Sequence, residues 1–195
     1  MPRAGLSTAS VVATAAEIAD AAGLDGLTLA RLAAAAGVRT PSLYNHVGSL
    51  DDVRRRVALV AIGELAAALR SAAVGRAGDD ALVSMAAAYR DYARRHPGRY
   101  AATQRAPAAG DDELAAAAVE AVAVVLAILR GYGLEGDDAI HAARAVRSAL
   151  HGFVALEAGG GFGIPVDLDE SFAWMVATLA RGLADVSGSR PARVS

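Results

Sequence analysis

The sequence predicts an all-α protein. Apolar residues recur three and four positions apart along most of the 195 residues, and this spacing places them on one face of a helix. Few stretches alternate between apolar and polar residues in the manner of a half-buried strand. Glycine and proline interrupt the helical spacing repeatedly, so we expect several separate helices rather than one long one.

The first predicted helix covers about residues 7–22. Its start carries Ser7 and Thr8, either of which can cap the first turn because a hydroxyl oxygen accepts hydrogen bonds from the free amides there. Gly23 follows as a stop signal, since glycine adopts the left-handed conformation at low cost.

Two short helices joined by a tight turn are predicted next, within residues 28–47. Thr28 can cap the first of them, and Gly37 ends it. Thr40 is expected to cap the second, with Pro41 at its first position, where the amide that proline lacks would have no partner. Four apolar residues are expected to face inward and hold the two helices together: Leu29, Leu32, Leu43 and Val47.

A long helix is predicted after these two, because Ser49-Leu50-Asp51-Asp52 is similar to a capping box and places two carboxylates at the positive end of the helix dipole. This helix is expected to end at about residues 73–78. Further helices are expected at about 79–95, 97–105, 111–132, 137–158 and 169–187. We therefore predict an N-terminal domain of residues 5–65 with a helix-turn-helix motif at 28–47, and a C-terminal helical bundle of residues 75–187.

The bulk composition favours a cytoplasmic protein. The chain has no cysteine, which excludes a disulfide framework and a thiolate metal site. The first residues, MPRAGLSTAS, contain no apolar core of a secretory signal. The most apolar run, Leu114 to Leu129, is interrupted by Glu120 and is shorter than the roughly 20 residues that a membrane span requires. We expect no membrane partner.

The helix pair in residues 28–47 has properties that suit DNA recognition. Its turn is short and contains glycine, so the helices would cross steeply. The second helix is brief and carries hydrogen-bonding side chains that suit phosphate oxygens or base edges. An ordinary pair of packed helices explains the same pattern equally well. The net charge is −2, so no overall basic field attracts nucleic acid.

Five short runs make the interpretation more specific: Thr28-Leu29, Arg31-Leu32-Ala33, Gly37-Val38, Ser42-Leu43-Tyr44 and His46-Val47. In type and in position, after one capped helix and before a long one, these runs resemble the N-terminal domain of the TetR family of transcriptional regulators. The resemblance covers about residues 6–65. It implies a dimeric, all-helical repressor whose C-terminal domain binds a small molecule.

The resemblance implies roles for individual residues. Tyr44 and His46 resemble the family's phosphate-contacting pair, and Thr28 would add a phosphate contact at the start of the preceding helix. Four further residues are the candidates for contacts with base edges: Arg39, Thr40, Ser42 and Asn45.

Two departures from the family pattern predict weak electrostatic attraction to DNA. Family members often carry lysine in the region that here reads Ser49-Leu50-Asp51-Asp52, and the recognition helix has no basic residue beyond Arg39 at its edge. Arg3, Arg31 and the collar of Arg54–Arg56 could supply the missing positive charge. A solvated helix face is an equally good interpretation of the collar.

The C-terminal half resembles a subgroup of the family that is marked by a His-Gly pair. The resemblance is carried by Leu150-His151-Gly152-Phe153, then Glu157, a glycine run and Gly163-Ile164-Pro165-Val166. Subgroup members usually have tryptophan just before the pair, where this chain has Val146-Arg147-Ser148, so the match over about residues 142–183 is partial. It implies a ligand-binding and dimerisation domain and names no ligand.

Seven aromatic or polar residues on expected inward faces are candidates for a ligand pocket, since such pockets are mostly apolar with a few placed polar groups. They are Tyr89, Tyr92, Tyr100, His151, Phe153, Phe162 and Trp174. Core packing explains any one of them at least as well. Arg144 and Arg147 could face an acidic ligand or pair with local carboxylates.

The sequence contains no pattern typical of catalysis. The histidines, His46, His96, His141 and His151, show no metal-ligand spacing, and no serine nucleophile elbow occurs. The glycine run joins two helices, so it does not form a phosphate cradle after a strand. We predict no enzyme activity, no metal and no cofactor.

The function that we expect is that of a ligand-responsive repressor, which binds a palindromic DNA operator as a homodimer and is released by a small molecule. The dimer would form through the last two long helices, about residues 137–158 and 169–187. The alternative is a helical ligand-binding or sensing protein with weak or lost DNA binding, which the uncharged recognition helix and Asp51-Asp52 would explain.

Overall fold

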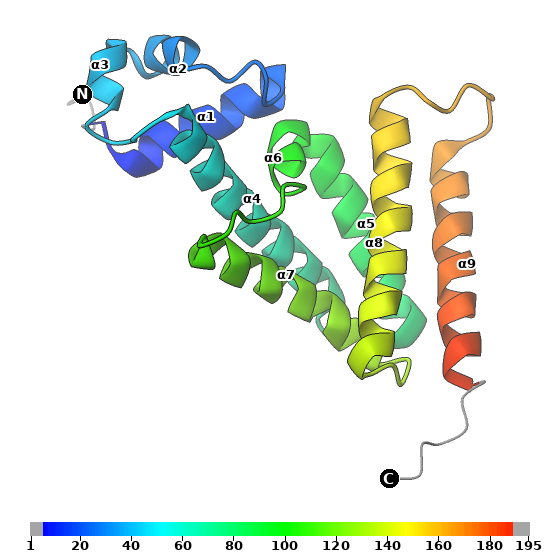
Figure 1. Ribbon diagram of the computed structural model, residues 1–195. Helices are drawn as coiled ribbons and strands as arrows, with labels where there is room; N and C mark the ends of the chain where they lie inside the picture. Colours follow the sequence, from blue (N-terminus) through cyan, green and yellow to red (C-terminus); the bar gives the residue numbers. More distant parts are fainter. Residues whose placement is uncertain (1–5, 189–195) are drawn as a thin grey trace. The chain divides into compact units, whose positions relative to one another are not determined.

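The computed structural model describes residues 6–188, and all regular structure within them is helical (Figure 1). The helices are α1 (Thr8–Ala22), α2 (Leu29–Ala36), α3 (Thr40–Leu43), α4 (Leu50–Ala73), α5 (Gly78–Arg95), α6 (Pro97–Ala102), α7 (Asp112–Arg130), α8 (Gly136–Ala158) and α9 (Leu168–Gly188). The all-α prediction is confirmed. None of these helices is both long and apolar enough to cross a membrane.

The chain forms two compact units. The first comprises the described residues up to Glu64 together with Arg95–Ala118, and it contains α1 to α3, most of α4, α6 and the start of α7. The second comprises Leu65–Arg94 together with the described residues from Val119 onward. The predicted limits, 5–65 and 75–187, divide the chain once, whereas the first unit also includes the later segment 95–118.

α1 begins and ends where its sequence predicts. Ser7 is the N-cap residue, and its hydroxyl accepts from the Ser10 amide at 3.1 Å while the Ser10 hydroxyl accepts from the Ser7 amide at 2.9 Å. These reciprocal bonds satisfy two amides that the helix leaves free. Gly23 ends the helix with a positive φ of 73°. The apolar face is fully buried at Val11, Ala15 and Ala19.

The helix pair of α2 and α3 is held by leucines. Of the four residues predicted to face inward, Leu32, Leu43 and Val47 are buried and Leu29 is half-buried. Leu27, which was not among them, is completely buried as well. Gly37 takes the left-handed conformation at the end of α2, and its amide donates to the carbonyls of Ala33 and Ala34. The turn that follows therefore has a defined direction, and it places α3 against the buried leucines.

α3 differs from its prediction at both ends. Arg39 rather than Thr40 is the N-cap residue, and it makes no side-chain capping bond. The helix ends at Leu43 instead of continuing to Val47. The amides of His46 and Val47 both donate to the Leu43 carbonyl, at 2.8 and 3.0 Å, so the chain closes into a turn on one acceptor.

α6 packs directly on α1 in the first unit. Asp20 of α1 accepts a hydrogen bond from the Arg99 amide at 2.8 Å, and its carboxylate lies 3.2 Å from Nδ1 of His96. The Arg99 side chain forms ion pairs with Asp20 and Glu64. Gly98 is buried at this contact. The contacts of Asp20 join residues that are more than 70 positions apart in the sequence.

The second unit is built on the buried faces of α5, α8 and α9, and α8 and α9 lie side by side (Figure 1). α5 buries Leu82, Met85, Tyr89 and Tyr92, as its spacing predicts. α8 buries Val146, Leu150, Phe153 and Val154, and α9 buries Phe172, Val176, Ala180 and Leu183. Both of these stripes follow the helical period.

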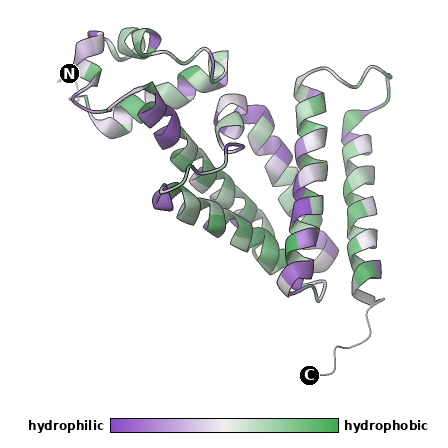
Figure 2. Ribbon diagram, viewed as in Figure 1, coloured by the Kyte–Doolittle hydropathy of each residue, from purple (hydrophilic) through white to green (hydrophobic). Residues whose placement is uncertain are grey.

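Three residues expected to face inward are exposed instead, namely Val122, Phe162 and Trp174. Val122 is 40% exposed, and α7 buries Val124 and Ile128 in its place. Trp174 is 69% exposed because it lies two residues after the buried Phe172, which is about 200° around the helix. α7 is hydrophobic along most of its length after an acidic first turn (Figure 2), so it presents apolar residues on more than its buried face.

Candidate nucleic-acid interface

The residues predicted to contact DNA lie on α2, on α3 and in the turn after α3. Thr28, Arg39, Tyr44 and Asn45 are exposed, and Thr40, Ser42 and His46 are half-buried. Tyr44 is an exposed aromatic residue, with 55% of its surface accessible. The side chains of Arg39, Tyr44 and Asn45 make no hydrogen bond or ion pair within residues 6–188. The helix pair thus presents polar groups whose hydrogen-bonding capacity its own fold does not use.

Thr28 acts as the N-cap of α2. Its hydroxyl oxygen accepts from the Arg31 amide at 3.2 Å, while its single proton remains available. The same hydroxyl can therefore donate to an anion such as a phosphate oxygen without losing its capping bond.

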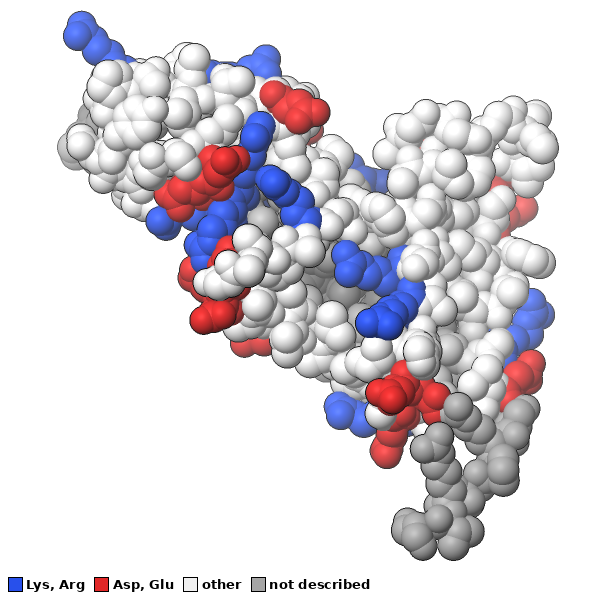
Figure 3. Space-filling model, in the orientation of Figure 1, with Lys and Arg blue, Asp and Glu red and all other residues white. Residues whose placement is uncertain are grey.

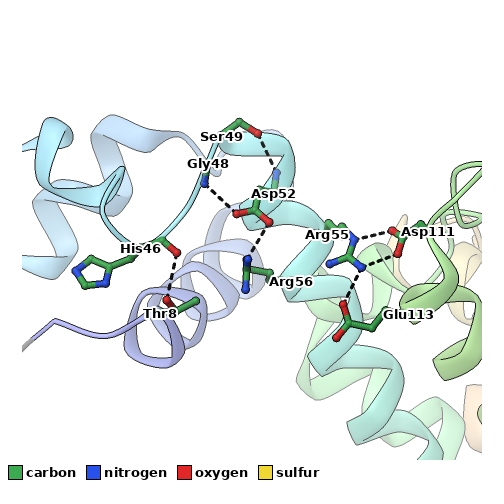
Figure 4. A network of polar contacts seen from close by, with 9 residues as sticks. All are labelled: Thr8, His46, Gly48, Ser49, Asp52, Arg55, Arg56, Asp111 and Glu113. Atoms are coloured by element: carbon green, nitrogen blue, oxygen red, sulfur yellow. Dashed lines mark hydrogen bonds and ion pairs between the residues drawn. The ribbon is translucent and has the colours of Figure 1, made fainter.

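The turn after α3 is tied to α1 and to α4 (Figure 4). The Thr8 hydroxyl donates to the His46 carbonyl at 3.2 Å, and the imidazole of His46 points away from this bond. Two residues later, the Gly48 amide donates to Asp52 Oδ2 at 3.0 Å, and the Asp52 amide donates to the Ser49 hydroxyl at 3.1 Å. The capping box predicted at the start of α4 is present in this form, with its carboxylate bond made to Gly48.

The collar of Arg54–Arg56 is engaged within the first unit. Arg54 donates to the Leu24 carbonyl at 3.3 Å and lies 3.7 Å from Asp51. Arg56 pairs with Asp52 at 2.9 Å. These carboxylates occupy the guanidinium groups that the sequence offered as phosphate partners, so the collar contributes little free positive charge.

Arg55 forms the strongest of the collar contacts (Figure 4). Its guanidinium binds Asp111 through two bonds of 2.7 and 2.6 Å and Glu113 at 2.8 Å. These hydrogen bonds hold the pKa of Asp111 below its ordinary value and raise the pKa of Arg55. Both groups therefore stay charged over the physiological range. On the face seen in Figure 3, basic and acidic side chains are interspersed rather than gathered into a basic patch.

The predicted ligand-contacting residues fall into separate environments. Tyr100 is buried in the first unit, and Tyr89 and Tyr92 are buried on α5 in the second. His151 and Phe153 lie on α8, Phe162 lies in the loop before α9, and Trp174 is exposed on α9. Their role in ligand binding remains a prediction. Within residues 6–188 no group of three or more histidine or carboxylate side chains could hold a metal ion.

All three phenylalanines of the chain form one aromatic cluster, and a buried arginine lies over two of them. The ring of Phe153 lies 4.9 Å from that of Phe162 and 5.0 Å from that of Phe172. The Arg90 guanidinium lies over Phe153 and Phe172, at 5.3 and 4.8 Å from their centroids. This cluster was not predicted from the sequence. The sequence feature that could have indicated it is Arg90, a charged residue that lies four positions after Ala86 on the apolar stripe of α5.

Two carboxylates neutralise Arg90. Glu157 of α8 binds it through two hydrogen bonds, one of them 2.9 Å long, and Asp169 of α9 pairs with it at 2.8 Å. The bonds from Arg90 lower the pKa of Glu157 below its ordinary value. The arrangement joins α5, α8 and α9.

A hollow of about 500 Å³ lies elsewhere in the second unit, between the ends of α4 and α7 and the start of α5. Its walls are aliphatic, and charged residues stand among them. The lining residues are Arg70, Ala73, Val74, Arg76, Ala77, Ala81, Glu120, Ala123, Val124, Ala127, Ile128 and Gly131. None of the seven predicted ligand-contacting residues lines it. Its volume is within the range of pockets that hold small molecules.

Two relatives match this architecture along nearly the whole chain. The HTH-type transcriptional regulator Rv0681 of Mycobacterium tuberculosis is 48% identical over 181 residues, which are 92% of this chain and 83% of the relative. The HTH-type transcriptional regulator YobS of Bacillus subtilis is 37% identical, over 93% of this chain and 95% of the relative. The chain is therefore a DNA-binding transcriptional regulator of the helix-turn-helix class.

The family is given by the C-terminal half. Residues 82–179 match the model of the tetracyclin repressor-like C-terminal domain. Together with the two relatives, this match shows that the chain belongs to the TetR family of transcriptional regulators, whose members are not enzymes. The resemblance stated from the sequence is confirmed.

Solved structures share the same fold. A protein of unknown function from Rhodococcus sp. RHA1 superimposes with a TM-score of 0.79 at 25% identity, over 94% of this chain and 98% of that one. The regulator SCO7222, a TetR from Streptomyces coelicolor, gives a TM-score of 0.72 at 18% identity, over 94% of this chain and all of that one (100%). Because SCO7222 is only 18% identical, its likeness to this chain describes the fold alone.

Proposed function

We propose that this regulator is a repressor, which binds a palindromic operator as a homodimer and is released when a small molecule binds its second unit. The main support for a DNA-binding surface here is a set of exposed side chains on the helix pair, which buried leucines hold in place. Arg39, Tyr44 and Asn45 have no partner within the described residues, so they can form hydrogen bonds with DNA without breaking any in the protein.

We assign the contacts as the family resemblance implies. Tyr44, His46 and Thr28 would hold phosphates, and Arg39, Thr40, Ser42 and Asn45 would reach base edges. The half-buried position of His46 suits a phosphate contact at the rim of the groove, while its carbonyl keeps the bond from Thr8.

The dimer would form through α8 and α9. Their exposed faces carry large apolar side chains that a single chain leaves in water, namely Leu156 at 51%, Trp174 at 69% and Val186 at 52% exposed. A second copy placed by a two-fold axis would cover the same residues on both partners and give a four-helix bundle. Two recognition helices held about one DNA turn apart would then match two half-sites.

The effector would act by shifting a population between two arrangements of the dimer. We propose the aliphatic hollow of the second unit as its site, because the hollow has the volume and the apolar walls that small-molecule sites require. The seven aromatic and polar candidates named above remain the second proposal for this site. A ligand that binds better to the arrangement with mismatched half-site spacing would release DNA.

A gel shift tests the DNA-binding part. The dimer is titrated at low salt against the DNA upstream of its own gene, with an unrelated fragment as competitor. We expect a shift at submicromolar dimer that the competitor does not abolish. A folded protein that gives no shift at micromolar concentration would favour the alternative, a sensing protein with weak DNA binding. The internal pairing of the arginine collar is the observation behind that alternative.

The single tryptophan of the chain tests the dimer. Trp174 is exposed in the single chain and would be covered in the proposed interface. Its emission should shift to longer wavelength on dilution, in step with a fall in mass measured by light scattering. A monomer at all concentrations, with constant emission, would exclude the interface.

A further inference from the structure

We propose that Arg39 reads a guanine in each half-site and is the main specificity-determining residue of this regulator. The inference rests on the proposed DNA binding and deepens it, since it names the base that the recognition helix selects.

The other arginines of the motif region are already engaged. Residues 6–64 contain five arginines, and the three of the collar pair with Asp51, Asp52, Asp111 and Glu113. The guanidinium of Arg31 donates to the Gly26 carbonyl at 3.2 Å. Arg39 is the one that makes no hydrogen bond or ion pair within the described residues. Among the arginines of residues 6–64, Arg39 is therefore the one whose guanidinium donors are all free.

The position of Arg39 suits a contact in the major groove. It is the N-cap residue of α3, with φ −84° and ψ 147°, and it is exposed. The N-terminal residues of a recognition helix are those that reach base edges. The residues that follow it, Thr40, Pro41 and Ser42, have short side chains, so the helix end can approach the bases closely. The arginine side chain is longer than these neighbours, so it has the reach that a base contact requires.

The chemistry of the side chain selects the base. A guanidinium donates through a planar fork and accepts nothing. In the major groove only guanine offers two acceptors side by side, O6 and N7. Adenine pairs an acceptor with a donor, cytosine offers a donor, and thymine offers one acceptor beside a methyl group. A bidentate contact from Arg39 to a base edge is therefore a contact to guanine.

The experiment begins with selection of operators from a random duplex library by the wild-type protein. A motif with a G·C pair at symmetric positions is expected. If the wild type selects no sequence, DNA recognition itself fails, and the proposed function falls together with this inference. If it selects a motif, each selected guanine is replaced in turn by 7-deazaguanine, which lacks the N7 acceptor and keeps O6. The affinities of the wild type and Arg39→Ala are measured on every duplex.

Removing the contact between Arg39 and guanine should affect recognition at one base of each half-site and at no other. We expect 7-deazaguanine at one symmetric pair of positions to weaken wild-type binding about tenfold or more, and to leave Arg39→Ala unaffected. Arg39→Gln should shift preference at that pair toward adenine. The slope of log affinity against log salt should not change, since no phosphate contact is lost.

Arg105→Ala is the matched control. Arg105 is exposed, lies in the turn after α6 and makes no ion pair within residues 6–188, so its removal takes away one charge outside the helix pair. This variant should select the wild-type motif. The inference is overturned if Arg39→Ala weakens binding to all duplexes equally and makes the salt slope shallower, because Arg39 would then contact phosphate. It is overturned equally if Arg39→Ala selects and binds the wild-type motif as the wild type does.

Discussion

Gly98 of α6 lies against the Ala19 carbonyl of α1 so closely that a β-carbon at position 98 would fall 2.0 Å from both the carbon and the oxygen of that group. Only glycine permits this approach. Around it, Asp20 accepts from the Arg99 amide, so the backbones of the two helices are held together by a hydrogen bond as well as by packing.

Gly98→Ala should therefore destabilise the first unit. The clash is with backbone rather than with a flexible side chain, so α6 must move away from α1, at a cost of about 1–3 kcal/mol or more. Urea denaturation followed by circular dichroism measures it. Gly63→Ala, on α4, is the control, because a β-carbon there meets nothing within 4 Å and should stabilise by about 0.5–1 kcal/mol. Equal stabilities for the two variants would contradict the close contact.

Asp52 holds the turn that follows α3, the proposed recognition helix, where its negative charge would oppose DNA binding. Asp52→Asn keeps an oxygen that can accept from the Gly48 amide, while it removes a negative charge and releases Arg56. We expect tighter DNA binding with little change in stability. Asp52→Ala loses the bond as well and should reduce stability by about 1 kcal/mol. The two variants are compared by fluorescence anisotropy and by denaturation, and weaker binding by a stable Asn variant would refute the assignment.

The paired collar also predicts a shallow salt dependence. Each phosphate that a protein neutralises contributes about −0.9 to the slope of log affinity against log salt. With three collar arginines held by carboxylates, we expect a slope no steeper than about −4 for the proposed dimer. Affinity measured between low and moderate salt gives the slope. A value near −8 would mean that the collar arginines leave their carboxylates to bind DNA.

The pair of Arg90 and Glu157 predicts how the second unit responds to acid. Hydrogen bonds from Arg90 lower the pKa of Glu157 in the folded protein below its ordinary value of 4.5. The ion pair therefore contributes its full stabilisation at pH values above the pKa of the unfolded chain. This stabilisation is lost as the pH falls through the lower pKa of the folded protein. Glu157→Gln should be less stable by about 2 kcal/mol at pH 7 and should lose less stability in acid. Thermal melts from pH 7 to pH 3 measure both effects. If the melting temperatures of the variant and the wild type fell equally between pH 7 and pH 3, the pairing would be contradicted.

Local signals made most of the fold predictable. The helices follow from apolar spacing, and their ends follow from Ser7, Thr28 and the left-handed Gly37, each of which acts within one turn of its own position. The position of the helix pair at residues 28–47 could also be predicted from the sequence. The end of α3 was not, since it depends on two amides sharing the Leu43 carbonyl rather than on a breaker residue.

Pairing across the sequence was not predictable. Arg55 and Asp111 are 56 residues apart, and no periodicity of either segment indicates that they meet. The collar therefore allowed two interpretations, free positive charge or a solvated face, and the structure gives a third, which is neutralisation by carboxylates. Arg3, offered with the collar as a source of charge, lies outside the described residues. Trp174 was expected on an inward face, whereas its angle from the buried Phe172 places it outside.

The central claim is that the surface after α3 binds DNA, and Tyr44→Phe tests it most directly. The substitution removes one hydroxyl from an exposed ring, and that hydroxyl has no partner within residues 6–188, so the fold should be unchanged. Affinity for a selected operator duplex is measured by fluorescence anisotropy, with unfolding by urea as the control. We predict about a tenfold loss of affinity at unchanged stability, since a hydrogen bond to a charged phosphate is lost in each half-site. Unchanged affinity would contradict the account.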